Sequence, residues 1–511
     1  MNLQIHNKQA FPIDLSGANS TDEFCVLNIN VGQDQVIQDL VWNIVFCIDN
    51  SGSMTDKCKD ERTKMDHIKH TITNCLRLFA QTTTHTFNVC SASFSEDVTE
   101  LFDFTRVTAD NVDVLISKIQ GVFPTCSTNI VKPLQYARAK LNGAKRAGEK
   151  YIHILLTDGD DTCNNDAKKL IDTVCMDFKN IFIGFGKEHN SKVMERMCGG
   201  IINEYKYIDM LECAGLVYGE ILHSMMYLVY ENARIAVENG LIYDYMNNIW
   251  VNELDIGYLV ADKPRSFHIR TTTRDIDDLK VNFMTTEHLA VLFGRDGFLS
   301  DQTKYIYRQR VLELLYVAKR AGGIEQVNET KKILKKMLAD LKKKMEEIGA
   351  TEDTFWKVMC DDIYVAILAL GSDYAHMYLS ARQTSQGRQN AYNVTVVEDD
   401  FGSMEFPDDT GVFHRLRLVR SRADGTVDED FRRGPARRGR HRALNFDNLM
   451  NFPDGDLVYE KEEDGDDVDN ATTVVEDYGD ITFNYNMCSN VTSPYCTPSV
   501  SRVMNDTQNG V

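Results

Sequence analysis

Two hydrophobic patterns alternate along this chain between about residues 38 and 228. Almost unbroken apolar runs, VWNIVFCI at 41–48 and YIHILL at 151–156, are typical of strands buried on both faces of a parallel sheet. Strands separated by helices predict an α/β fold with a doubly wound, mostly parallel sheet. Segments with apolar residues at helical spacing are 59–79, 109–119, 129–146, 165–177 and 209–228. Further strands are predicted at 86–94 and 180–186, with an antiparallel edge at 100–104.

The pattern changes at about residue 229 to short segments in which apolar and polar residues alternate, such as NIWVNEL and SFHIRTTT. This alternation predicts an antiparallel β-sandwich or small barrel over 229–297. The N-terminal segment 1–37, with EFCVLNINV, has the same character. We expect it to pair with the later strands, so that the α/β domain is inserted between them. The alternative is two unrelated β elements.

Helical periodicity returns over 302–321, 324–348 and 353–382, which predicts a helical bundle of three helices over 298–385. The remaining segment, 386–511, mixes acidic runs with an arginine-rich stretch at 415–442. Such a composition cannot bury a core, so this tail is predicted to be disordered. Its arginines are the part of the chain suited to nucleic acid, although the flanking acidic runs could neutralise them.

Candidate chemistry lies where the buried strands of the α/β segment end. The run at 41–48 is followed by Asp49, Ser51 and Ser53, and the run at 151–156 leads to Asp158. Between them, Thr128 lies in a polar loop before a helical segment. Because ligands collect outside the carboxyl ends of strands in open α/β sheets, these three loops can share one site. Carboxylate and hydroxyl oxygens suit a small hard cation, Mg²⁺ or Mn²⁺.

Residues 38–228 resemble the von Willebrand factor type A domain, whose metal-ion-dependent adhesion site has the pattern Asp-x-Ser-x-Ser, then Thr, then Thr-Asp-Gly. The resemblance implies a Rossmann-like fold and a Mg²⁺ site in which a carboxylate of a partner protein completes the coordination. It implies that the metal ligands are Asp49, Ser51, Ser53, Thr128 and Asp158. The β and helical parts are more loosely similar to von Willebrand A proteins that carry Hint-type modules.

The sequence departs from the family pattern in one loop. Family members often have glycines before the threonine, whereas this chain has Cys126 and Ser127. The hydroxyls of Thr125 and Ser127 therefore stay as alternatives to that of Thr128.

Net charge and cysteine content indicate the class of partner and the cellular compartment. A net charge of −20 excludes a generally basic nucleic-acid surface, and it favours a basic protein as the partner that presents the carboxylate. The N-terminus lacks the pattern of a secretory signal, and no apolar stretch is long enough to cross a bilayer. Thirteen cysteines without a Cys-x-x-Cys pair predict free thiols. We therefore expect an intracellular protein, in the cytoplasm or the nucleus.

The sequence does not indicate an enzyme. Metal-assisted or serine-based catalysis needs a positioned base. The histidine nearest the candidate ligands along the chain, His153, lies inside a predicted strand. We predict a non-enzymatic interaction protein that binds a partner carboxylate through a Mg²⁺-dependent site. The alternative is a structural or assembly protein, of viral or protist origin, whose arginine-rich tail binds nucleic acid or another subunit.

Overall fold

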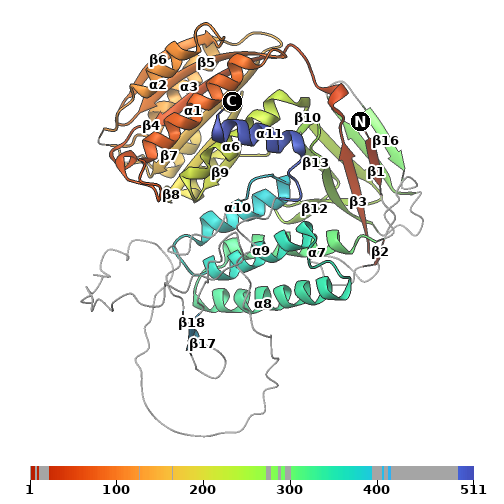
Figure 1. The fold of residues 1–511 in the computed structure, drawn as a ribbon. Coiled ribbons are helices and arrows are strands. Elements are labelled where there is room, and N and C mark those ends of the chain that lie inside the picture. Colours follow the sequence, from red (N-terminus) through yellow and green to blue (C-terminus); the bar gives the residue numbers. More distant parts are fainter. Residues whose placement is uncertain are drawn as a thin grey trace, which may run out of the picture.

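The computed structural model shows a mixed sheet with helices on both faces, a second β part beside it, and further helices that contact both (Figure 1). The described residues are 2–5, 9–10, 22–125, 127–163, 165–271, 278–285, 289–293, 301–393, 405–407, 413–415 and 493–510.

Six strands form the mixed sheet, in the order β6-β5-β4-β7-β8-β9. They are β4 (Val41–Asp49), β5 (Thr86–Phe94), β6 (Val98–Arg106), β7 (Lys150–Gly159), β8 (Lys179–Glu188) and β9 (Glu204–Ile208). All neighbouring strands run parallel except β6, which pairs antiparallel with β5 at the edge. The predicted α/β class with a mostly parallel sheet is therefore confirmed.

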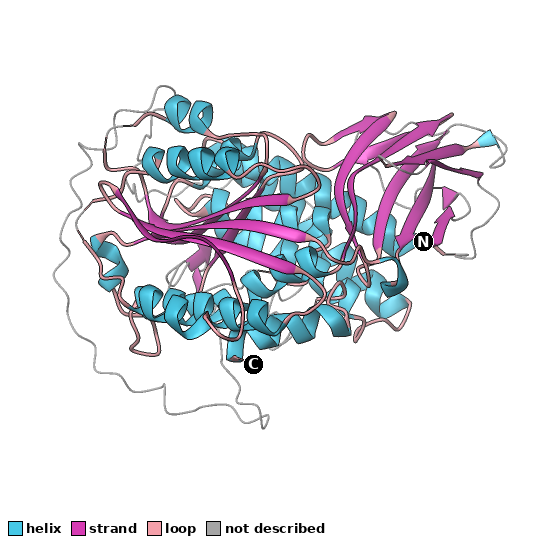
Figure 2. Ribbon diagram, turned by 90° about the horizontal axis from the view of Figure 1, so that it is seen from above, coloured by secondary structure: helices cyan, strands magenta, loops and turns pink. Residues whose placement is uncertain are grey.

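Helices cover both faces of this sheet (Figure 2). They are α1 (Lys64–Gln81), α2 (Val112–Gln120), α3 (Val131–Gly143), α4 (Ala167–Thr173), α5 (Ser191–Cys198) and α6 (Ala214–Met226). Alternate residues of β4 belong to two hydrophobic cores, one on each face of the sheet. Ile44 and Phe46 belong to the core with α1, α2 and α6, and Val45 and Cys47 belong to the core with α3, α4 and α5. The sequence of β4 is apolar at consecutive positions because both of its faces are buried.

Two elements of this region escaped prediction, α5 and β9. The helix α5 has eight residues, begins where the Asn190 side chain accepts a hydrogen bond from the Val193 amide, and ends at Gly199 in the left-handed region (φ 61°). An element of two turns carries too few apolar positions for its period to be recognised.

Ten antiparallel strands make up the second β part. One sheet has the order β1-β3-β14-β11-β12, with β2 beside β3, and the other has the order β13-β10-β15-β16. Their apolar residues form one shared core, and Leu27 of β3 lies opposite Phe267 of β14. The N-terminal strand β3 thus pairs with β14, more than two hundred residues later. The classification as a β-sandwich and the domain boundaries stay predictions. The bounds are β1 (Asn2–Ile5), β2 (Gln9–Ala10), β3 (Glu23–Asn30), β10 (Leu228–Glu238), β11 (Leu241–Asp244), β12 (Ile249–Val251), β13 (Glu253–Val260), β14 (Arg265–Thr271), β15 (Lys280–Met284) and β16 (Leu289–Phe293).

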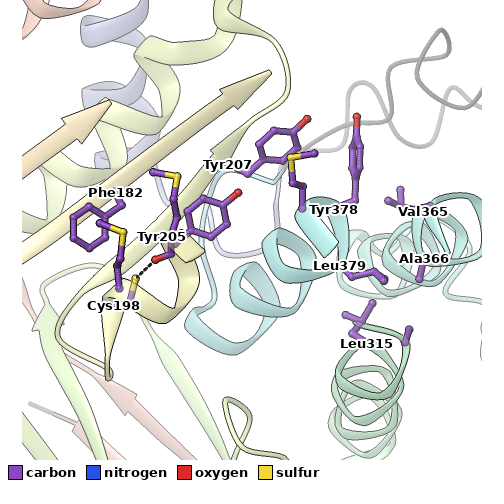
Figure 3. Close-up of a cluster of buried hydrophobic side chains, with 14 of the residues drawn as sticks. Phe182, Cys198, Tyr205, Tyr207, Leu315, Val365, Ala366, Tyr378 and Leu379 are labelled. Atoms are coloured by element: carbon purple, nitrogen blue, oxygen red, sulfur yellow. Dashed lines mark hydrogen bonds between the residues drawn. The ribbon is translucent and has the colours of Figure 1, made fainter. Parts of the chain in front are cut away.

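The helical part contains four helices, where three were predicted. They are α7 (Thr303–Arg320), α8 (Ile324–Glu347), α9 (Thr354–Ala369) and α10 (Ala375–Arg388). The predicted helix 353–382 is interrupted because Leu370 is extended and Gly371 adopts a positive φ of 90°. Figure 3 shows how this part packs against the mixed sheet, with the rings of Tyr207 on β9 and Tyr378 on α10 edge to face at 5.4 Å.

The C-terminal end departs from the predicted disorder. Residues Pro498–Asn509 form helix α11, which packs against α6 and α1, and residues 386–388 belong to α10. For α11 the prediction was wrong because Val500, Val503 and Met504 lie on one face of the helix and are buried against other elements. The short strands β17 (Glu405–Pro407) and β18 (Phe413–Arg415) pair with each other. Apart from Arg415, the arginine-rich stretch lies outside the described residues.

Within the described part of the chain, none of the helices has the length and apolar character that a bilayer span requires. The eleven cysteines described there are free thiols. Burial raises the pKa of the Cys75 thiol, which packs among apolar residues between α1 and the sheet. Such a thiol behaves as a small hydrophobic group.

Candidate metal site

The five predicted ligands come from three loops at the carboxyl edge of the mixed sheet. Asp49 is the last residue of β4, and Asp158 is the last but one of β7. The two strands are parallel neighbours, with Ile48 opposite Leu156, so both carboxylates emerge at the same place. Ser51 and Ser53 lie in the turn after β4, which continues as a short 3₁₀ helix (Gly52–Thr55), and Thr128 precedes α3.

Hydrogen bonds link four of these residues directly. The Ser51 amide donates to Oδ1 of Asp49 at 2.7 Å, and the hydroxyls of Ser51 and Ser53 are 3.1 Å apart. The Ser53 hydroxyl donates to Oδ1 of Asp158 at 2.7 Å. The structure thus brings Asp49, Ser51, Ser53 and Asp158 into one cluster of oxygen atoms.

Thr128 lies at the side of this cluster and is buried. A β-carbon added at Gly159 would lie 3.9 Å from its hydroxyl oxygen, which places Thr128 beside the loop that follows Asp158. Of the two alternatives, Thr125 is exposed and donates through both its amide and its hydroxyl to the Asn50 carbonyl, at 2.6 and 3.3 Å. Ser127 is half-buried. The Thr128 hydroxyl thus lies beside Gly159, the residue after Asp158, whereas the Thr125 hydroxyl is already bound to the Asn50 carbonyl.

Sequence reasoning did not single out Thr157, which holds Asp49 in place. Its hydroxyl donates to Oδ2 of Asp49 at 2.6 Å. Burial raises the pKa of Asp49 to about 6, although the hydrogen bonds from Thr157 and Ser51 oppose this shift. An ionised Asp49 is therefore costly without a cation, which is the property expected of a preformed cation ligand.

A second residue missed from the sequence is Lys64, at the start of α1. Its ammonium nitrogen lies 2.7 Å from Oδ2 of Asp158 and 3.1 Å from Oδ2 of Asp56. The capping box between Thr63 and Asp66 begins α1 here and so directs Lys64 toward the site. No motif indicated this contact, because it depends on where the helix begins relative to β7.

The threonine loop is held by residues from the segment after β7. Asp161 accepts a hydrogen bond from the Ile130 amide at 2.8 Å. Thr162 and Thr128 exchange hydrogen bonds through main-chain and side-chain atoms, between 2.8 and 3.1 Å long. These contacts position Thr128 from the same loop that carries Asp158. Asp161 and Thr162 act through other residues, so a ligand motif could not have identified them.

The assembled groups are carboxylate and hydroxyl oxygens, with no sulfur or imidazole among the predicted ligands. Such a set fits Mg²⁺ or Mn²⁺, since hard cations take oxygen ligands. A different group of possible ligands lies nearby, formed by Cys58, His67 and Glu212. Burial raises the pKa of Cys58 to about 11, which disfavours the thiolate that a metal requires, and His67 already contacts Asp60 at 3.0 Å.

The chain is similar to several solved structures of low sequence identity. No functionally curated protein matches the chain. Among solved structures, a von Willebrand factor type A protein from Catenulispora acidiphila is 14% identical, with a TM-score of 0.44 over 74% of this chain and 89% of its own. The ArnB paralog VWA2 from Sulfolobus acidocaldarius is 13% identical, with a TM-score of 0.43 over 76% of this chain and 98% of its own.

Proximal thread matrix protein 1 from the mussel byssus, described with a zinc-occupied metal-ion-dependent adhesion site, is 15% identical. Its TM-score is 0.31 over 40% of this chain and 50% of its own. The family model for the von Willebrand factor type A domain matches residues 43–209. Residues 43–209 of this chain therefore form a von Willebrand factor type A domain.

Proposed function

We propose that the chain is a non-enzymatic interaction protein that binds a partner protein through a divalent cation held at the carboxyl edge of its mixed sheet. The supporting observation is the convergence of Asp49, Ser51, Ser53 and Asp158 into one hydrogen-bonded cluster of oxygens, with Thr128 beside it. These five residues would hold Mg²⁺ or Mn²⁺. When bound, the ion would act as a Lewis acid toward a carboxylate of the partner.

The charge of this chain indicates the kind of partner. With a net charge of −20, the protein repels acidic surfaces at low ionic strength. A partner that presents one Asp or Glu from an otherwise basic surface would approach the site with the least repulsion.

The state of His189, a buried imidazole near Asp158, supports a binding role over catalysis. His189 is close enough to Asp158 for their charges to interact, and its ring nitrogens contact the Gly186 carbonyl at 3.0 Å and the Tyr205 hydroxyl at 2.7 Å. Burial lowers its pKa to about 4. A general base works best with a pKa near the working pH and a free nitrogen, and His189 has neither feature.

Titration calorimetry tests the metal site. We expect Mg²⁺ and Mn²⁺ to bind the wild-type chain, and Asp49→Ala to abolish the binding heat. Asp97→Ala is the matched control, because Asp97 is an exposed acidic residue between β5 and β6 that pairs with Lys132. Wild-type protein without binding heat, or an Asp49→Ala variant that binds as well as wild type, would contradict the metal site.

Affinity capture with and without chelator tests the partner. Proteins bound through the ion should be lost both on chelation and from Asp158→Ala, while they stay bound to Asp97→Ala. Identical captured proteins in all samples would exclude the metal bridge even if the metal binds.

A further inference from the structure

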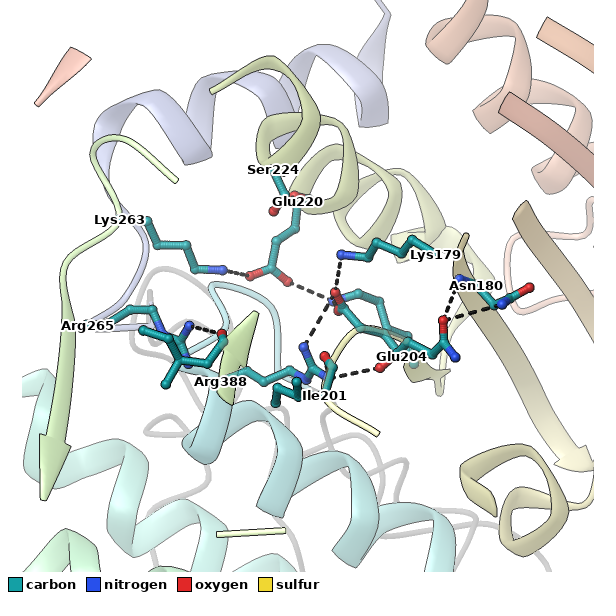
Figure 4. Close-up of polar contacts among 12 residues, drawn as sticks. Lys179, Asn180, Ile201, Glu204, Glu220, Ser224, Lys263, Arg265 and Arg388 are labelled. Carbon is teal, nitrogen blue, oxygen red and sulfur yellow. Dashed lines mark hydrogen bonds and ion pairs between the residues drawn. The ribbon is translucent and has the colours of Figure 1, made fainter. Parts of the chain in front are cut away.

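Five basic side chains meet between the von Willebrand A domain, the second β part and the helical part (Figure 4). Lys179 begins β8 and Lys206 lies in β9, Lys263 precedes β14 and Arg265 begins it, and Arg388 ends α10. Their side chains are largely buried, at most 14% exposed where they form ion pairs. We call these five residues the junction cations.

Two carboxylates accompany the junction cations. Glu204 lies 2.7 Å from Lys179 and 3.6 Å from Arg388, and Glu220 lies 2.9 Å from Lys263. Lys206 contacts both acids, at 3.5 and 3.4 Å. Although burial opposes it, these neighbours hold the pKa of each carboxyl below its usual range, so both are ionised at neutral pH. Three positive charges are left in excess.

Arg265 is the junction cation without a carboxylate partner among the described residues. One guanidinium nitrogen donates to the Ile256 carbonyl at 2.9 Å, while its buried Nε has no hydrogen-bond partner in the part of the chain that the structure describes. Burial and then the charge of Arg388 lower its pKa to about 10, so it is charged at neutral pH. A buried, unpaired donor on a charged group is costly, and a bound anion would remove that cost.

The junction cations line a cavity of about 60 Å³. Since one water needs roughly 10–15 Å³ of such space, the cavity holds about four to six water-sized atoms. Four oxygens around one central atom match this size. Guanidinium and ammonium groups are also the donors that bind phosphate and sulfate oxygens.

We propose that this cavity binds a small tetrahedral oxyanion of the phosphate type, with Arg265 as its central ligand. The anion offsets most of the excess charge and ties together β8 and β9, the β13–β14 segment and α10. The site is distinct from the candidate metal site, because Lys179 is opposite Ile152 near the start of β7, whereas Asp158 lies near its end.

Thermal unfolding of the full chain in chelator tests the proposal, comparing phosphate with chloride at equal ionic strength. We expect phosphate to raise the unfolding midpoint in a saturable way, by about 1–2 °C at ten times its dissociation constant. Sulfate should act similarly. A parallel series with glycerol 3-phosphate distinguishes a free oxyanion from the phosphate group of a larger ligand.

Arg265→Met should lose the response to phosphate, because it removes the unpaired guanidinium without leaving a carboxylate unpaired. Arg146→Met is the matched control, since Arg146 is exposed and lies outside the cavity, and it should respond like wild type. If Arg265→Met does not fold, calorimetry with wild-type protein replaces it, and one phosphate per chain is expected. No phosphate binding to wild type, or an unchanged response of Arg265→Met, would overturn the proposal.

Discussion

The ammonium nitrogen of Lys64 lies 2.7 Å from Oδ2 of Asp158, whose other carboxylate oxygen accepts the hydrogen bond from Ser53. Asp158 is buried, and the Lys64 side chain is 19% exposed. Burial lowers the pKa of Lys64, but hydrogen bonding and charge interaction with Asp158 raise it above the ordinary value. The metal-free site therefore contains a cation from its own chain.

Lys64→Met should raise the affinity for Mg²⁺ by about tenfold or more. A divalent ion in the proposed site would be repelled by the ammonium group of Lys64 and would compete with it for Asp158. When two charged groups are in contact, their interaction energy exceeds about 1 kcal/mol even when it is well screened. Calorimetry measures the change. Lys57→Met is the control, because Lys57 precedes α1 but pairs with Glu61 on the surface. An unchanged or weaker affinity of Lys64→Met would show that the lysine does not compete with the ion.

Asp49→Asn should leave the metal-free protein at least as stable as wild type. Because burial raises the pKa of Asp49 to about 6, the ionised carboxylate destabilises the folded protein by about 2–3 kcal/mol at neutral pH. A neutral amide avoids this cost, although its weaker hydrogen bond with Thr157 cancels part of the gain. Denaturant unfolding in chelator measures this difference. With Mg²⁺ the order should reverse, since only wild type gains from binding. A variant that is strongly destabilised in chelator would show that Asp49 has a structural role.

Gly219→Ala should destabilise the protein by about 1–3 kcal/mol, despite the better helix propensity of alanine. A β-carbon added at Gly219 of α6 would overlap the backbone of Met504 in α11. Gly143→Ala in α3 is the matched control, because a β-carbon there meets no atom within 4 Å, and it should be neutral or stabilising. Thermal unfolding and hydrogen exchange of 498–509 check the result. Slow exchange there with unchanged stability would mean that α11 tolerates the methyl group.

His153 should make the protein sensitive to acid. Burial lowers its pKa to about 4, against a hydrogen bond to Asn180. Between pH 6.5 and 4 the unfolded chain binds a proton at this residue and the folded chain does not, so stability falls as the pH falls through this window. The loss from this one group is about 2 kcal/mol at pH 5.

His153→Gln should reduce the difference in unfolding free energy between pH 7 and pH 5 by about that amount, because its amide stays neutral and still reaches Asn180. An undiminished pH dependence of His153→Gln would assign the acid sensitivity to other groups.

Much of the α/β domain was predictable because its local patterns are strong. The apolar residues of β4 and β7 are buried on both faces of the sheet, so they appear as almost unbroken runs that lead to Asp49 and Asp158. The short α5 lacked such a signal. The predicted helix 353–382 is interrupted at residues 370–374, where Leu370 is extended and Gly371 has a positive φ, so that α9 and α10 are separate helices.

The sequence by itself determined which strands are buried, where their aspartates emerge, and that serine and threonine hydroxyls accompany them, because strand periodicity and ligand spacing are local properties. Only the tertiary structure decided that Lys64 reaches Asp158, that α11 returns to α6, and that five cations meet beside two carboxylates. These contacts join residues far apart in the chain. They depend on where helices begin and how separate parts pack, and no short segment of sequence encodes either.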